Sequence, residues 1–196
     1  MSYSFYEIYI TAQRAFTAMG FPYGCDEDAA FIITWLELNN FQGIKILSNL
    51  ISEMDQKYEG KIEINNLNEK INFKNKSILM KGAGLIDYLN SEIKNKNKIS
   101  INIINCKDGI LFLPLLYKKS EYVNSYQLTF HDVNNEIKTY EIIDKEIILC
   151  QKKYSDLLNQ NTVCIVINNN KEKVNNSNKN SIISEKKKSK KSCAIY

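Results

Sequence analysis

The fold is decided by residues 20–36, GFPYGCDEDAAFIITWL, where a turn rich in glycine and proline leads into an unbroken helical pattern. Gly20 and Pro22 end the element before them, because glycine closes a helix in the left-handed conformation and proline cannot continue one. The three acids after Cys25 suit the positive N-terminal end of a new helix. Apolar residues then cover nearly the whole circumference up to Trp35, so we expect this helix to be packed on several sides.

Further periodic segments lie on both sides of that stretch. Residues 5–19 carry apolar side chains on one helical face, and Ser4 with Glu7 has the spacing of a capping box. Residues 43–58 show the same helical period, and beyond residue 60 alternation indicates strands. The strand candidates are 61–64, 77–80, 99–103, 109–117, 126–131, 137–142, 146–150 and 162–167, with a helix near 85–93.

These periods predict an α+β fold, with an N-terminal helical segment packed on a mainly antiparallel or mixed β-sheet. We expect a single globular domain over residues 1–168, divided into a helical segment (1–59) and a mixed α/β part (60–168). Residues 169–196 form a basic tail with few apolar side chains, which we expect to be disordered.

Charge and cysteine content exclude several classes of protein. The net charge of the 196 residues is +4, but residues 169–196 hold eight Lys and two Glu, which leaves −2 for residues 1–168. A slightly acidic body is not the electrostatic footprint of a nucleic-acid-binding protein. Five dispersed cysteines and one histidine, His131, argue against a disulfide scaffold and against a zinc site. With no basic leader and no long apolar run, we expect a cytoplasmic protein without a membrane partner.

Small and rare residue types gather near the N-terminus. The chain has 25 Asn, 28 Ile and 25 Lys, a bias typical of an AT-rich genome. Ala, Gly, Pro, Arg and Trp, which need G and C in their codons, total 18, and 11 of them fall within residues 11–43. We infer that these residues have a structural or functional role, because the codon bias alone would make them rare in this segment.

Arg14, the only arginine, is the leading candidate for ligand binding, because a guanidinium can clamp a carboxylate or phosphate with two hydrogen bonds. Tyr23, Glu27 and Lys81 complete the candidate binding set. The alternative for Arg14 is a structural ion pair with Glu27 or Asp28, acids that also suit the helix dipole. The sequence identifies no catalytic residue, and it predicts neither a cofactor nor a metal site.

Other residues are interpreted as structural. Phe31 and Trp35 are expected in the core or in a subunit interface. Gly82-Ala83-Gly84 lacks the third glycine of a dinucleotide-binding loop, since that position is Asp87, and it is expected to be a tight turn. His131 is expected to be a solvated residue at the end of a hairpin.

The C-terminus has the form of a prenylation box, Cys193-Ala194-Ile195-Tyr196, after a run of lysines. Tyrosine is an unusual last residue for such a box, so we interpret the segment as a solvated charge run. A protein tethered to a membrane through a prenylated Cys193 and its polybasic tail remains a remote alternative.

Residues 20–29, together with Trp35-Leu36, resemble the N-terminal signature of the bacterial family known as domain of unknown function 3726. Residues 80–87 and 111–116 resemble later landmarks of that family. The likeness is most specific over the first 45 residues and is poor after Asn124. It implies a family label but no activity.

A fainter similarity links the same opening to the N-terminal helical segment of type-2 malate and L-lactate dehydrogenases. In that family the segment leads into a Ser-His-Gly motif with a catalytic histidine. Here residues 43–47 are Gly-Ile-Lys-Ile-Leu, and the chain is too short for that family's cofactor domain. This difference argues against dehydrogenase activity.

The sequence therefore predicts a non-catalytic or accessory protein of metabolism that assembles through its N-terminal helices, with itself or with another protein. The alternative is an enzyme or binding protein for a small carboxylate metabolite that uses Arg14.

Overall fold

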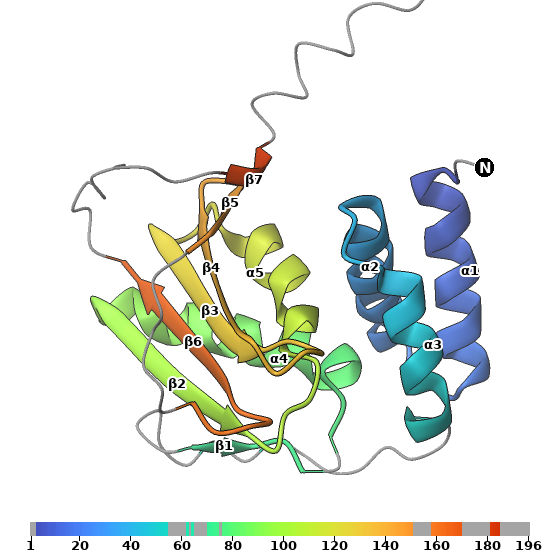
Figure 1. Cartoon of the computed structure of the whole chain (residues 1–196), viewed down its shortest axis with the longest axis horizontal. Helices are drawn as coiled ribbons and strands as arrows, with labels where there is room; N and C mark the ends of the chain where they lie inside the picture. The colour runs from blue at the N-terminus through green and yellow to red at the C-terminus, as the bar shows by residue number, and fades with distance from the viewer. Residues whose placement is uncertain are drawn as a thin grey trace, which may run out of the picture.

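The structure, a computed structural model, describes residues 3–54, 62, 64, 70–74, 76–150, 158–169 and 181–184 (Figure 1). The helices are α1 (Phe5–Ala18), α2 (Cys25–Leu38), α3 (Gly43–Met54), α4 (Ile78–Glu92) and α5 (Leu113–Lys119), with the 3-10 turns η1 (Ile93–Asn95) and η2 (Gly109–Phe112). The strands are β1 (Ile71–Asn72), β2 (Lys98–Ile104), β3 (Ser125–His131), β4 (Ile137–Ile143), β5 (Glu146–Leu149), β6 (Val163–Asn168) and β7 (Ser181–Ser184). The predicted α+β class is confirmed.

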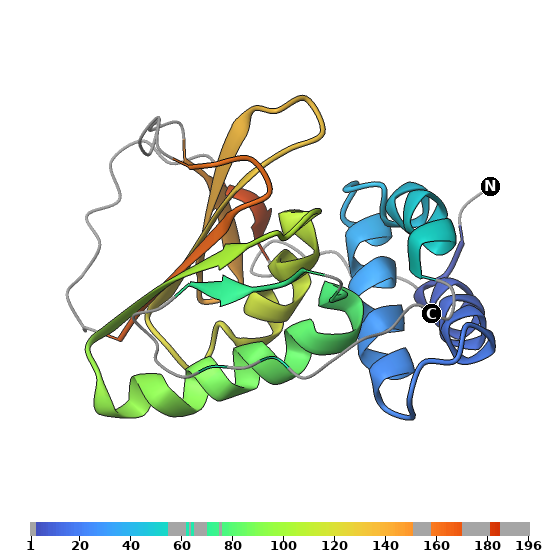
Figure 2. The ribbon, with the colours of Figure 1, turned by 90° about the horizontal axis from the view of Figure 1, so that it is seen from below.

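All seven strands belong to one mixed sheet in the order β1-β2-β6-β3-β4-β5-β7. The pairing of β1 with β2 is parallel, and every other neighbouring pair is antiparallel. Helices α4 and α5 cover one face of the sheet, and α1, α2 and α3 form a cluster beside them (Figure 1 and Figure 2). We call this cluster, residues 3–54, the N-terminal helical unit.

Buried and exposed side chains alternate along the strands, and the buried ones form the core between the sheet and helices α4 and α5. In β2 the side chains of Ile99, Ile101 and Ile103 are buried, while Lys98 and Ser100 on the opposite face are exposed. The neighbouring strand β6 repeats this alternation, as expected for strands with one face on a core.

Helix α2 is the packing centre of the N-terminal helical unit. Ala29, Ala30, Ile32, Ile33 and Leu36 are all fully buried, so its apolar surface is covered around the helix. It packs against α1, α3, α4 and α5. The predicted packing of this helix on several sides is confirmed.

The backbone explains much of the cluster of small residues at 11–43. Gly20 and Gly24 have φ angles of +85° and +86°, in the left-handed region that favours glycine. A Cβ atom on Gly43 would collide with the carbonyl oxygen of Ile33 and lie 2.9 Å from the amide nitrogen of Glu37. Glycine at this position therefore lets the start of α3 approach the backbone of α2.

Two predicted strands are wrong. Residues 77–80 lie at the start of α4, so Gly82-Ala83-Gly84 is a helical segment and not a tight turn. Gly82 is buried there, and a Cβ on it would lie 3.0 Å from the Leu115 side chain, so the glycine lets α4 and α5 come close.

Residues 109–117 form η2 and the first part of α5 instead of a strand. Pro114 suits the first turn of α5, where the missing N–H would have no helical partner.

Other predictions lie partly outside the described residues. Residues 55–58 of the predicted third helix are not described, and of the predicted strand 61–64 only residues 62 and 64 are, neither of them in a strand. In the C-terminal segment 169–196, which the composition predicts to be disordered, residues 181–184 form β7. This strand pairs with β5 through Ile147 and Ile183. The rest of that segment beyond residue 169 lies outside the described residues.

Trp35→Ala is expected to destabilise the fold by about 3–5 kcal/mol, the usual range for removing a large aromatic core side chain. Trp35 is 8% exposed, and its ring centroid lies 5.0 Å from that of Tyr117 and 6.0 Å from that of Phe41. Urea unfolding measures the change. Tyr23→Ala, at a side chain 93% exposed, is the control and should change stability by less than about 0.5 kcal/mol. A Trp35→Ala protein as stable as the control would contradict a core role.

Gly43→Ala and Gly84→Ala should have opposite effects on the melting temperature. A methyl group on Gly43 meets the backbone of α2, and such overpacking costs about 1–3 kcal/mol. Gly84 lies exposed within α4 with no atom within 4 Å of the added carbon, so alanine should stabilise by about 0.5–1 kcal/mol. Equal melting temperatures for the two variants would show that the α2–α3 contact does not need glycine.

Candidate functional site

The four predicted ligand-binding residues lie on three helices and a loop. Arg14 is exposed on α1, Tyr23 is exposed in the turn between α1 and α2, Glu27 is exposed on α2, and Lys81 is half-buried on α4. None of the four lines either of the two hollows described below. Three of the four side chains are exposed, and neither of these hollows brings any of the four together.

The acids at the start of α2 have structural partners. The Thr17 hydroxyl donates to Asp26 Oδ2 at 3.0 Å, and the Gly24 amide donates to Asp26 Oδ1 at 2.9 Å. Burial acts to raise the pKa of Asp26, but these hydrogen bonds and those from nearby backbone amides outweigh burial and lower it. Asp26 thus ties α1 to the start of α2, while the neighbouring Asp28 carboxylate lies 3.9 Å from Lys118 Nζ rather than beside the guanidinium of Arg14.

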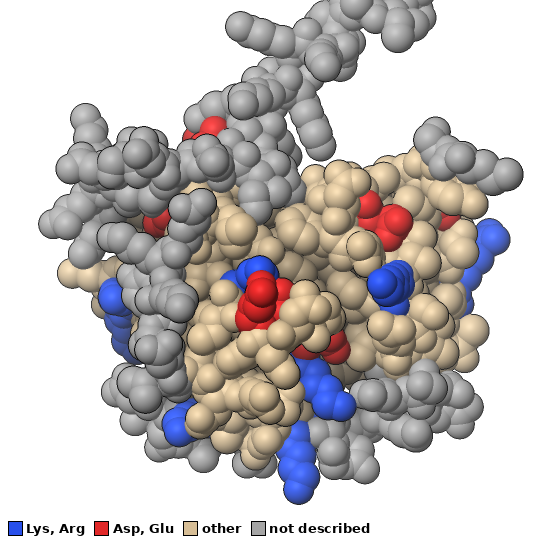
Figure 3. All heavy atoms as spheres, viewed as in Figure 1, with Lys and Arg blue, Asp and Glu red and all other residues tan. Residues whose placement is uncertain are grey.

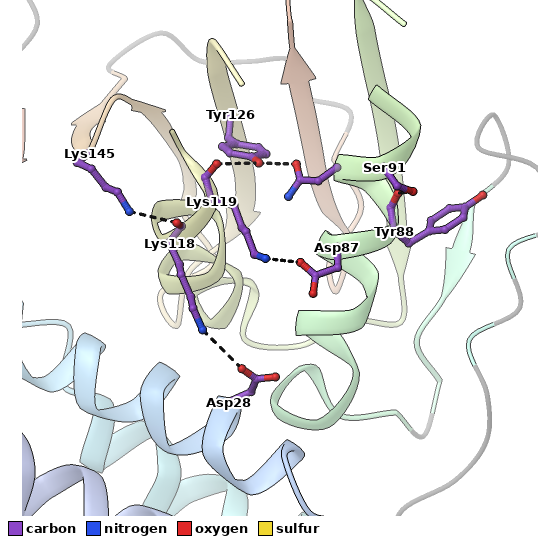
Figure 4. Close-up of polar contacts among 9 residues, drawn as sticks. Asp28, Asp87, Tyr88, Ser91, Lys118, Lys119, Tyr126 and Lys145 are labelled. Atoms are coloured by element: carbon purple, nitrogen blue, oxygen red, sulfur yellow. Dashed lines mark hydrogen bonds and ion pairs between the residues drawn. The ribbon is translucent and has the colours of Figure 1, made fainter. Parts of the chain in front are cut away.

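A set of polar contacts joins the N-terminal helical unit to the rest of the fold (Figure 4). Lys118 on α5 reaches Asp28 on α2 and lies over the ring of the half-buried Phe31, 5.0 Å from its centroid. Lys119 Nζ lies 2.6 Å from Asp87 Oδ1 on α4, and Lys145 Nζ donates to the Lys118 carbonyl at 3.1 Å. The hollow among these residues is only about 40 Å³, so the set is structural.

The buried Tyr126 belongs to the same region. Its hydroxyl donates to Asn90 Oδ1 at 2.5 Å and lies 3.4 Å from the carbonyl oxygen of Lys119. Burial raises the pKa of Tyr126, although the hydrogen bond to Asn90 acts in the opposite direction. The neutral phenol therefore joins β3 to α4 and α5 beneath the sheet.

A larger hollow of about 350 Å³ lies between α3, the chain that links β2 to η2, the β3–β4 hairpin and the chain that leads into β6. We call it the His131 hollow. Its lining residues are Asn49, Leu50, Cys106, Lys107, Asp108, Gly109, Phe130, His131, Asp132, Val133, Asn135, Asn161 and Thr162. Its volume falls in the range of natural small-molecule sites.

The chemistry of the His131 hollow is polar but not that of a reactive thiol site. Nδ1 of His131 is buried and has no hydrogen-bond partner among the described residues. Burial, and secondarily the carboxylate of Asp108, raise the pKa of the Cys106 thiol to about 12, so this thiol stays protonated at neutral pH. The lining thus offers hydrogen-bonding groups without an activated nucleophile at Cys106.

Sequence reasoning missed this hollow. Its residues come from positions as far apart as 49 and 162, and the sequence predicts only a solvated hairpin residue at His131. Three lining residues, Asp108, Asn135 and Asn161, have positive φ angles of 55–58°, which Asp and Asn tolerate better than most residues. Asp and Asn at these positions indicate tight turns in several loops, but they do not indicate that the loops lie side by side.

The described part of the chain has neither a cluster of metal-binding side chains nor a helix suited to span a membrane. Among those residues, no group of three or more His, Cys, Asp or Glu side chains could hold a metal ion. None of the helices in the described ranges is long and apolar enough to span a membrane.

The exposed apolar side chains are unevenly distributed. Eleven large apolar side chains are exposed among the described residues, and seven of them belong to the N-terminal helical unit. Those seven are Tyr3, Phe5, Tyr6, Tyr23, Leu38, Ile44 and Ile51. On the face drawn in Figure 3, acidic and basic side chains are interspersed, and several of them adjoin near the centre of the view. The uncharged areas between them are broad.

A family model described as Protein of unknown function (DUF3726) matches residues 3–110, which is more than half of the chain. The matched range covers α1 to α4 and β2 and ends within η2, so the landmark at 111–116 lies beyond it. Curated proteins and solved structures give no match, and nothing bears on the fainter dehydrogenase similarity.

Asp26→Asn is expected to lower stability at neutral pH by about 1 kcal/mol, because a charged hydrogen-bond acceptor becomes neutral. The lowered pKa also fixes the sign of the pH dependence. A carboxyl with a lower pKa in the folded state stabilises above its unfolded value, near 3.8, and this contribution is lost as the pH falls through the folded value. Urea unfolding from pH 7 to pH 2 should show a smaller acid-induced loss for the variant, and parallel pH profiles would exclude this role.

Proposed function

Because the chain belongs to the DUF3726 family, whose description names no function, we propose a role from its surface. The protein is an accessory, non-catalytic protein of metabolism that assembles with a second copy of itself through the N-terminal helical unit. The proposal places it in the bacterial cytoplasm, in line with the family resemblance.

The observation that carries this proposal is the concentration of exposed apolar side chains on residues 3–51. Tyr6 is 71% exposed on α1, and Ile44 and Ile51 are exposed on one side of α3. Grouped apolar side chains at the surface commonly mark protein–protein interfaces. Tyrosine is also enriched in interfaces, because its large ring buries much area at a small cost in side-chain entropy.

A second copy is the occupant that fits the charges of α1. Glu7 and Arg14 are both exposed and lie seven residues apart, so they fall on the same side of the helix two turns from each other. Two copies of α1 packed antiparallel about a two-fold axis near the partly exposed Ile10 would place each Glu7 opposite Arg14 of the other copy. The interface would then be self-complementary in charge.

The position of Arg14 also favours this role over the alternative, binding of a small carboxylate. A guanidinium on an exposed helix face has no surrounding walls to enclose a metabolite, whereas it is well placed to contact another chain. The remote alternative of a prenylated Cys193 concerns a residue outside the described part of the chain.

Light scattering coupled to gel filtration tests the assembly. We expect a mass near twice the 22.7 kDa of one chain. Tyr6→Lys should shift the mass towards one chain, because it places a charge in the proposed interface, while Val133→Lys at the exposed hairpin tip is the matched control and should leave the mass unchanged. A monomer mass for the unaltered protein over the accessible concentration range would overturn the proposal.

A charge exchange tests the antiparallel arrangement. Arg14→Glu should weaken the dimer, because it puts two acids on each side of the interface, and the double variant Glu7→Arg with Arg14→Glu should restore it. Glu7 also completes the capping box with Ser4, so circular dichroism must first show that α1 stays helical. Equal dimer dissociation constants for the single and the double variant would rule out this pairing.

A further inference from the structure

The C-terminal strand β7 is held on one side only. Among the described strands it pairs with β5 alone, at the edge of the sheet (Figure 1). The register between the two strands shifts within β5 and consists of three residue pairs: Glu146–Ser184, Ile147–Ile183 and Ile148–Ser181. Because β5 pairs with β4 along its other side, β7 can leave the edge without changing that pairing.

The edge of β5 is suited to bind an extended strand. Its sequence, Glu-Ile-Ile-Leu, has neither the proline nor the lysine that commonly keep an edge strand from pairing. Ile147 and Ile148 are buried, so apolar side chains lie along this edge. Unpaired amides and carbonyls on such a strand form a template for another chain segment. We therefore expect this edge to bind an extended strand whenever one is within reach.

The chain reaches β7 by a long link. β7 follows β6 in the sequence, but β3, β4 and β5 lie between these two strands in the sheet. The crossing spans four strand spacings, about 19 Å, in addition to the return along the sheet that two strands of the same direction require. Residues 170–180 can extend to about 40 Å. This length lets β7 reach the β5 edge of a neighbouring copy as well as that of its own chain.

We propose that β7 is exchanged between two copies of the chain, so that the β5 edge of each copy is a binding site for the C-terminal strand of the other. The exchanged strand forms the same residue pairs as it does within one chain, so the contact needs no new complementary surface. A second copy is therefore the occupant that fits this edge. The contact is separate from the proposed interface on α1, because it involves no residue of the N-terminal helical unit.

Disulfide trapping between two full-length variants tests the exchange. Glu146 lies opposite Ser184 in the register, so Glu146→Cys in one chain and Ser184→Cys in the other place two thiols side by side when β7 pairs with the second copy. The two variants are mixed under reducing conditions and then oxidised, and mass spectrometry identifies the linked peptides. The link between positions 146 and 184 should form at least tenfold faster than the link formed when Val133→Cys, at the exposed hairpin tip, replaces Glu146→Cys. Equal rates, or no link between 146 and 184, would overturn the proposal.

Binding of a peptide localises the site to the β5 edge. The probe is a fluorescent peptide with the sequence of residues 179–185, KNSIISE. The full-length double variant Ile182→Pro with Ile183→Pro loses the pairing of its own β7, because proline has no amide hydrogen to donate to β5. It should bind the probe at least tenfold more tightly than the unaltered protein, whose own strand competes at high effective concentration.

The matched control for the peptide is Ile195→Pro, in the same C-terminal segment but outside β7, which should bind the probe as weakly as the unaltered protein. Circular dichroism checks that each variant is folded. A folded double variant that does not bind the probe, or equal dissociation constants for all three proteins, would contradict the assigned edge.

Discussion

A helix that is apolar around its circumference cannot remain at a surface, and the burial of α2 is the constraint on which the rest of the structure depends. Ile32, Ile33 and Leu36 are fully buried, so neighbours must cover α2 on each side. Close approach needs small residues at the contacts. Alanines 29 and 30 supply them on α2 itself, and Gly43 supplies one at the start of α3.

The same helix joins the N-terminal helical unit to the sheet. Trp35 packs against Tyr117 of α5, and Phe31 lies beneath the ammonium group of Lys118. Since α5 and α4 also cover the sheet, α2 shares one continuous core with β3 and its neighbours. The ion pair between Lys118 and Asp28 is long, at 3.9 Å, and half exposed, so packing rather than charge holds the two parts together.

Elements marked by several signals close together in the sequence could be predicted, and elements without such local signals could not. The helices at 5–18 and 25–38 were predictable because caps, glycine stops and apolar periods all agree locally, and the Ser4–Glu7 capping box is present. The sequence predicts a strand at 109–117 where the structure has η2 and α5, because an almost wholly apolar segment has no period that distinguishes strand from helix. There Pro114 is a helix-start signal, because it occupies the first turn of α5.

The candidate site could be predicted even less, because it depends on how segments far apart in the sequence meet. Arg14 was singled out by its rarity, but rarity does not state which way a side chain points, and α1 turns it away from the core. His131 had no local signal, because the hollow around it depends on loops from distant segments meeting beside α3.

Helix α3 borders two different surfaces of the molecule. Ile44 and Ile51 are exposed on one side of this helix, while Asn49 and Leu50, one turn along, line the His131 hollow. Gly43 lets the start of α3 lie against the α2 backbone, so the position of both sides depends on the packing of α3 on α2. Ala29, Ala30 and Gly43 are buried on α2 and α3, and the close packing that these small residues allow holds both surfaces in place.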